Sequence, residues 1–210
     1  MASDNNRELT ADDVEITARD EVYSGYLRVE AVRLRHRRHA GGWTSEMGRE
    51  LVERGHAVAV LPYDPVLDRV VLIEQFRIGA YAAGRPPWQI EIVAGIIEPG
   101  EALEDVARRE CVEECGCRIG ALVHMCDFLT SPGVMSETVA IYCGRTDASE
   151  AGGVHGLDHE HEDIRAIALA AETAFDWLDD GRILNGPAIV ALQWLRRERA
   201  RLREDWRGQT

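Results

Sequence analysis

The sequence of 210 residues predicts an α/β sandwich preceded by a smaller N-terminal antiparallel β subdomain. From residue 57 onward, short apolar runs typical of strands alternate with segments of helical period, a mixture that favours a sheet covered by helices. Within residues 1–56 the side chains also alternate, but few are large and apolar, so these strands are expected to pack on another surface. We therefore divide the chain into a β subdomain, 1–56, and a sandwich domain, 57–210.

The individual elements follow from local patterns. Residues 1–20 are polar and are expected to be loose. Alternating side chains predict one strand over 22–36 and another over 45–52. Apolar runs predict further strands at 57–61, 70–73, 88–93, 118–129, 137–145 and 164–168. Helical periodicity predicts helices at 101–115, 171–180 and 187–204, and the polar stretch 147–162 is expected to be a loop.

Composition and charge exclude several classes of function. The chain has 24 arginines, no lysine and 37 acidic residues, which gives a formal net charge of −13. The absence of lysine excludes Schiff-base enzymes and the Walker A phosphate loop, and so acidic a chain is not expected to bind nucleic acid. No run of about 18 apolar residues occurs, and the five cysteines form no zinc-binding pattern. We therefore expect no membrane contact, reduced thiols and a cytoplasmic protein.

The segment 95–117 carries the pattern that indicates chemistry. Glu110, Glu113 and Glu114 fall on one face of the predicted helix. Like charges so close destabilise a helix unless they are neutralised, and Mg²⁺, which prefers oxygen ligands, would neutralise them. A solvated acidic helix face is the plainer alternative. Gly116 is placed to end the helix. An apolar stripe is expected to face the sheet, formed by Leu103, Val106, Ala107 and Cys111.

This segment resembles the Nudix box, G-x5-E-x7-R-E-U-x-E-E-x-G-U, in which U is aliphatic. Every fixed Gly, Glu and Arg of the box matches, and only the two U positions, Cys111 and Cys117, depart from the usual residues. The resemblance extends over most of the chain to the bacterial ADP-ribose pyrophosphatase branch of that family. Its carriers are Glu53–Ala57, Glu74–Ile78, Glu91–Gly95, Ser131–Gly133 and Gly156–Asp163. Pro132, fifteen positions after Cys117, is typical of the ADP-ribose branch.

The resemblance implies both a fold and an activity. The fold is a Nudix α/β/α sandwich with a mixed sheet. The activity is Mg²⁺-dependent hydrolysis of the pyrophosphate bond of ADP-ribose to AMP and ribose 5-phosphate, with Mn²⁺ as a substitute metal. A homodimer with exchanged N-terminal strands is also implied. Two alternatives remain: a hydrolase of another nucleoside diphosphate sugar such as GDP-mannose, and a regulator that binds ADP-ribose without cleaving it.

The resemblance also implies roles for single residues. The metal ligands would be the Ala94 carbonyl and the carboxylates of Glu110, Glu113, Glu114 and Glu162. Glu160 would activate the attacking water and, with Glu110 and Glu114, complete the catalytic set. Substrate contacts would come from Arg77, Arg49, Glu137, Pro132 and Gly133. The shape of the box would depend on Gly95, Glu101, Arg109 and Gly116. His159 and His161 are interpreted as bystanders, and no residue is assigned to stack on adenine.

Overall fold

The computed structural model describes residues 7–206, and its contacts divide the chain into two compact units. Unit 1 consists of Met1–Gly55 together with Leu129–Glu137, and unit 2 consists of His56–Phe128 together with Thr138–Thr210. The second segment of unit 1 lies outside the predicted β subdomain, 1–56.

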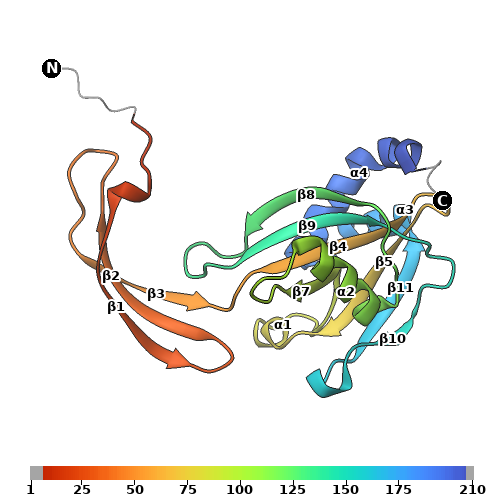
Figure 1. The fold of residues 1–210 in the computed structure, drawn as a ribbon, viewed down its shortest axis with the longest axis horizontal. Helices are drawn as coiled ribbons and strands as arrows, with labels where there is room; N and C mark the ends of the chain where they lie inside the picture. The colour runs from red at the N-terminus through yellow and green to blue at the C-terminus, as the bar shows by residue number, and fades with distance from the viewer. Residues whose placement is uncertain (1–6, 207–210) are drawn as a thin grey trace. The chain divides into compact units, whose positions relative to one another are not determined.

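Unit 1 is a three-stranded antiparallel sheet in the order β1 (Val14–Ser24), β2 (Arg28–His36) and β3 (Met47–Glu53) (Figure 1). A short 3₁₀ turn, Ala11–Asp13, precedes β1. The segment Leu129–Glu137 attaches along β3, because the Val52 N–H donates to the carbonyl of Val134 at 2.8 Å. The Ser136 hydroxyl also donates to Glu53 in the same unit.

The strand β1 corrects the prediction that residues 1–20 are loose, and the single strand predicted over 22–36 is in fact two strands. Nearly every side chain of β1 is exposed, so no apolar period distinguishes it from a polar tail. Backbone pairing with β2 forms the strand instead, and cross-strand ion pairs support it. In one of these pairs, Arg35 lies 2.7 Å from Glu15, and in another Arg19 contacts the buried Glu30.

Unit 2 is built on a mixed eight-stranded sheet in the order β10-β11-β5-β4-β9-β8, with β6 paired to β5 and β7 paired to β4. Its strands are β4 (Ala57–Asp64), β5 (Arg69–Phe76), β6 (Trp88–Glu91), β7 (Val93–Ile96), β8 (Leu122–Leu129), β9 (Thr138–Arg145), β10 (Gly153–His155) and β11 (Ile164–Ala170). The strand β4 runs parallel to β9 and antiparallel to β5 and β7.

Helices cover both faces of this sheet. The helix α2 (Leu103–Cys115) lies on one face, and α3 (Ala171–Asp179) and α4 (Gly186–Trp206) lie on the other (Figure 1). Alternate residues of β4 enter the two cores: Val58 joins the cluster under α2, and Ala59 joins the cluster under α4. The predicted α/β/α sandwich with a mixed sheet is thereby confirmed.

Smaller elements differ from the prediction. The short helix α1 (Ile78–Ala82) was not expected, and the predicted loop 147–162 contains β10 and a 3₁₀ turn, Asp158–Glu160. All five cysteines are free thiols. Within residues 7–206, no helix is both long enough and apolar enough to cross a membrane.

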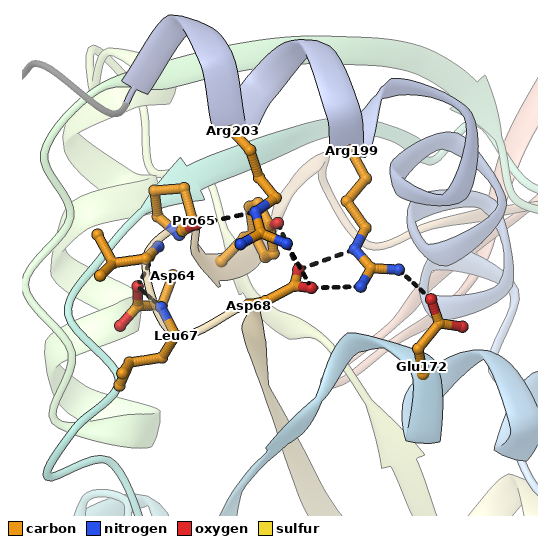
Figure 2. Close-up of polar contacts among 9 residues, drawn as sticks. Asp64, Pro65, Leu67, Asp68, Glu172, Arg199 and Arg203 are labelled. Carbon is orange, nitrogen blue, oxygen red and sulfur yellow. Dashed lines mark hydrogen bonds and ion pairs between the residues drawn. The ribbon is translucent and has the colours of Figure 1, made fainter.

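A network of ion pairs ties the turn between β4 and β5 to the helices α3 and α4 (Figure 2). Asp68 adopts a left-handed backbone conformation with a φ of 57°, and its carboxylate accepts hydrogen bonds from Tyr63 at 2.7 Å and from Arg203 at 2.8 Å. Arg199 donates to both oxygens of Asp68 and also contacts Glu172. The turn is therefore held by groups far away in sequence.

Candidate active site

The helix α2 carries the three glutamates that the sequence singles out. It begins at Leu103, two residues later than predicted, and ends at Cys115, before Gly116, whose φ of 67° is left-handed. The Cys117 N–H closes the last turn by donating to the Cys111 carbonyl at 3.0 Å. Three of the four residues of the predicted apolar stripe are wholly buried, but Leu103, the first residue of the helix, is 38% exposed.

Glu114 is buried against the strand that precedes the helix. It is only 3% exposed, and its Oε2 accepts the Ala94 N–H of β7 at 3.0 Å. Burial, together with the charges of Glu110 and Glu162, raises the pKa of Glu114 to about 8, although the hydrogen bond from Ala94 opposes the shift. The ionised form of Glu114 is therefore disfavoured, and a bound cation would stabilise it.

Glu110 lies one turn earlier on α2 and packs directly on Gly95. A Cβ atom placed on Gly95 would lie 1.8 Å from Oε1 of Glu110, so any other residue at this position would have to displace the Glu110 side chain. Burial raises the pKa of Glu110, Arg109 opposes the shift, and Glu113 and Glu162 add to it. Glu110 and Glu114 thus form a close pair of carboxylates beside β7.

Arg109 links the helix to the turn before it. Its guanidinium lies 2.7 Å from Glu110, 3.1 Å from Glu113 and 3.5 Å from Glu101. Glu101 in turn accepts the Glu98 N–H at 2.9 Å. These contacts fasten the turn 98–101 to the face of the helix that carries the glutamates.

The loop after β10 brings a further carboxylate to this face. The Gly156 N–H donates to the Glu113 carbonyl at 3.1 Å, and the Leu157 N–H donates to Glu162 at 3.2 Å. The charge of Glu162 acts on both Glu110 and Glu114, which places the three carboxylates in one electrostatic group. Glu160 lies on the neighbouring 3₁₀ turn, exposed, with its carboxylate 3.6 Å from His159.

Arg77 follows β5 and is held by an acid that sequence reasoning left without a role. Its Nη2 lies 2.8 Å from Oε2 of Glu91, which is 5% exposed at the end of β6. Burial alone would lower the pKa of Arg77, but Glu91, Glu114 and Glu162 raise it, so the guanidinium remains charged beside the carboxylate group. The signal for Glu91 was an acidic residue within the apolar run 88–93.

Known proteins share the sequence pattern of this chain. A model of the NUDIX domain matches residues 53–208, which is more than half of the chain. The chain belongs to the Nudix family. It is 47% identical over 194 residues to the ADP-ribose pyrophosphatase of Escherichia coli (strain K12), an alignment that covers 92% of this chain and 93% of that protein.

A second sequence relative and one solved structure are also similar to the chain. The GDP-mannose pyrophosphatase of Enterobacter sp. (strain 638) is 34% identical over 149 residues, with 70% of this chain and 76% of that protein covered. A crystal structure of an ADP compounds hydrolase matches with a TM-score of 0.69 and 21% identity, covering 97% of this chain and 100% of that one. At that identity the structural match supports the fold alone.

The donors on the Nudix helix are the kind that a hard divalent cation requires. Within residues 7–206, no three acidic, histidine or cysteine side chains converge closely enough to hold a metal as they lie. Glu110 instead contacts Arg109, and Glu162 accepts a backbone N–H. All of the candidate donors are nevertheless oxygens, and no arginine or histidine of the described residues forms an ion pair with the buried Glu114, so the set fits Mg²⁺.

Four residues implied in substrate binding belong to unit 1. Pro132 and Gly133 lie exposed in the segment Leu129–Glu137, and Arg49 is exposed on β3. Glu137 is buried and lies 3.3 Å from Arg54. Their roles remain predictions.

The contact between Gly95 and Glu110 gives a direct test of the Nudix carboxylate pair. Gly95→Ala is expected to displace the Glu110 side chain and to weaken Mg²⁺ binding by about 10–100-fold, as loss of a positioning contact does at metal sites. Titration calorimetry would measure the affinity. Gly186→Ala is the matched control, because a Cβ there meets open space. Equal Mg²⁺ affinity in Gly95→Ala and the wild type would show that Glu110 does not bind the metal.

Proposed function

We propose that the chain is a Mg²⁺-dependent hydrolase that cleaves ADP-ribose, with water, into AMP and ribose 5-phosphate. The observation that carries the proposal is the carboxylate group formed by the buried Glu114 and the half-buried Glu110 and Glu162, beside the charged guanidinium of Arg77. The high identity to a protein named ADP-ribose pyrophosphatase, over nearly the whole of both chains, supports the choice of substrate. Pro132 adds to that support, being typical of the ADP-ribose branch.

The proposed metal ligands are Glu110, Glu114, Glu162 and the Ala94 carbonyl, with Glu113 as an accessory and Mn²⁺ as a substitute for Mg²⁺. When bound, the metal would withdraw charge from the pyrophosphate and favour in-line attack by water. Arg77, oriented by Glu91, would bind a phosphate oxygen with the donors that Glu91 leaves free. Arg49, Glu137, Pro132 and Gly133 are proposed as further substrate contacts.

Glu160 is proposed to accept the proton of the attacking water. Its exposed position on the turn Asp158–Glu160 leaves the carboxylate accessible, and the bond from Gly156 to Glu113 anchors that loop to α2. A general base of this kind contributes about 10²–10⁴-fold to a rate. We propose Glu160 for this role rather than Glu162, which already accepts a backbone N–H.

Product analysis tests the reaction directly. Purified protein is incubated with ADP-ribose and Mg²⁺, with and without a chelator, and the products are separated. Chelator-sensitive release of AMP and ribose 5-phosphate in equal amounts is expected. Glu160→Gln is expected to lower turnover by about 100-fold or more while Mg²⁺ still binds. His159→Gln, on the same turn, is the control and should retain wild-type turnover. Release that continues in chelator would contradict the metal requirement.

GDP-mannose is the second candidate substrate, because a GDP-mannose pyrophosphatase is among the relatives. Equal concentrations of ADP-ribose and GDP-mannose in one reaction would decide between them. Dominant turnover of GDP-mannose would retain the proposed mechanism and overturn the proposed substrate.

We also propose a cytoplasmic homodimer formed through unit 1. In the described part of unit 1, Val32 is the only buried apolar residue, whereas Val14, Ile16, Val22 and Tyr23 on β1 are exposed. Exposed apolar side chains on a thin sheet favour burial against a second copy. Light scattering is expected to give twice the chain mass of 23.4 kDa. A mass of one chain at micromolar concentration would contradict the dimer.

A further inference from the structure

A cavity of about 610 Å³ lies in unit 2, away from the carboxylates on α2. It is formed by the turn after β4, the segment after α2 and the segment after β9. Val58, which pairs with Gly95 near the carboxylates, and Asp64, which lines the cavity, are six residues apart on β4. At about 3.3 Å per residue, the Cα atoms of Val58 and Asp64 are about 20 Å apart.

Two arginines in the cavity wall lack acidic partners. Among residues 7–206, neither Arg118 nor Arg145 forms an ion pair, and the Nε of Arg145 is buried without a hydrogen-bond partner. Buried charged donors are almost always satisfied in folded proteins, so an unsatisfied one indicates a missing partner. Arg108 does not line the cavity, but it donates to the carbonyls of two residues that do, Ile119 and Gly120.

The two acids in the wall are already occupied by backbone donors. Oδ1 of Asp64 accepts the N–H groups of Val66 at 2.8 Å and Leu67 at 2.9 Å, and Oδ2 accepts the Ala148 N–H at 2.9 Å. Asp147 accepts the Ser149 N–H at 2.9 Å. In the described part of the chain, neither acid forms an ion pair with Arg118 or Arg145, so no acid takes up the hydrogen-bond donors of these two guanidinium groups.

An apolar surface adjoins the arginines and is held in place. Val66 is 69% exposed and Leu67 is 46% exposed, although both are large apolar residues in the cavity wall. Figure 2 shows contacts that hold the same turn: Arg203 donates to the Pro65 carbonyl at 3.2 Å and contacts Asp68. The cavity therefore places two guanidinium groups, of Arg118 and Arg145, next to an apolar wall that contacts with Arg203 hold in place.

We propose that this cavity binds a nucleoside monophosphate. The phosphate would be bound by Arg118 and Arg145, since a guanidinium matches the geometry of phosphate oxygens. The base would lie on the wall of Pro65, Val66 and Leu67, and the volume suits a ligand of this size. This binding does not depend on the proposed hydrolysis. If that function holds, the cavity would take up AMP, one of its products, at a second place.

Titration calorimetry with AMP, in the presence of a chelator, tests the proposal. Arg145→Met is expected to weaken AMP binding by about tenfold or more, because the phosphate loses its hydrogen bonds to a charged guanidinium. Its melting temperature is expected to equal that of the wild type, since Arg145 has no ion pair to lose. Val66→Asp, which places a negative charge on the exposed wall, is expected to weaken binding by a similar factor. Arg197→Met, an exposed arginine on α4, is the control and should leave AMP affinity unchanged.

Three outcomes would overturn the proposal. One is the absence of AMP binding, and another is AMP binding that Arg145→Met and Val66→Asp both leave unchanged. The third is equal affinity for AMP and ribose 5-phosphate, which would remove the role of the apolar wall. Adenosine, which lacks the phosphate, is expected to bind at least tenfold more weakly than AMP. Because the assay follows binding in chelator, its failure is distinct from a failure of ADP-ribose hydrolysis.

Discussion

Glu114→Gln is expected to lower kcat/KM for ADP-ribose by about 1,000-fold or more, the largest effect on activity that the structure predicts. The substitution preserves the size of the side chain but removes the charge of a buried proposed metal ligand. Steady-state kinetics at saturating Mg²⁺ would measure the loss. Glu113→Gln is the comparison variant: Glu113 is an accessory and already contacts Arg109, so a much smaller loss is expected. Near wild-type kcat/KM in Glu114→Gln would exclude Glu114 as a metal ligand.

The same substitution is expected to stabilise the metal-free protein. The folded-state pKa of Glu114 is about 8, well above the ordinary value of 4.5. Between these two values the folded chain binds more protons than the unfolded chain, so the free energy of unfolding falls as pH rises. The stabilisation is complete below about pH 4.5 and is lost as pH rises through about 8. Its size is on the order of a few kcal/mol.

Urea unfolding in a chelator at pH 5.5 and 8.5 would measure this pH dependence. The wild type should lose stability between the two values, and Glu114→Gln should lose less, because an amide does not titrate. Glu113→Gln should retain the wild-type slope. A mutant that is less active and yet more stable without metal would mark Glu114 as a residue kept for function at a cost in stability. Identical pH slopes in the wild type and Glu114→Gln would contradict the account of burial.

The candidate site could be predicted where its parts lie close together in the chain. The stretch from Gly95 to Gly116 contains the turn, the helix, the glutamates and the residue that ends the helix. Spacing alone therefore placed Glu110 and Glu114 on one face. The contact of Gly95 with Glu110 could not be read in this way, since it depends on how β7 and α2 pack.

Features that depend on distant pairing could not be predicted. The strand β1 has no apolar period and forms only because β2 supplies its partners. Likewise, the role of Glu91 depends on the pairing of β6 with β5, which brings Glu91 to Arg77, the residue before α1. The cavity at Arg145 combines three segments from separate parts of the sequence. The residue pattern within one segment does not show which distant segments will pack against it.

Asp68→Ala is expected to reduce the free energy of unfolding by about 2–4 kcal/mol, the largest effect on stability. The substitution leaves Arg199, Arg203 and Tyr63 without their common acceptor. The loss is large because the Asp68 side chain is mostly buried, so water replaces the lost hydrogen bonds poorly. It also places alanine at a φ of 57°, a conformation that aspartate and asparagine tolerate better. Asp68→Asn separates the two causes, because it keeps the backbone preference and loses only the charge.

The loss in Asp68→Ala should itself depend on pH. Burial alone would raise the pKa of Asp68, but hydrogen bonds from Arg199 and Tyr63 outweigh it and hold the pKa below 3.8. The stabilisation from this carboxylate is therefore present above about pH 3.8 and is lost as pH falls through the lower folded-state pKa. Urea unfolding at pH 7 and pH 3 should show the difference between wild type and Asp68→Ala narrowing in acid. A difference that stays constant would assign the effect to the backbone at residue 68 rather than to the ion pairs.

Turnover of ADP-ribose by Asp68→Ala, well below its melting temperature, should be unchanged, because the β4–β5 turn lies at the opposite end of β4 from the residues paired with Gly95.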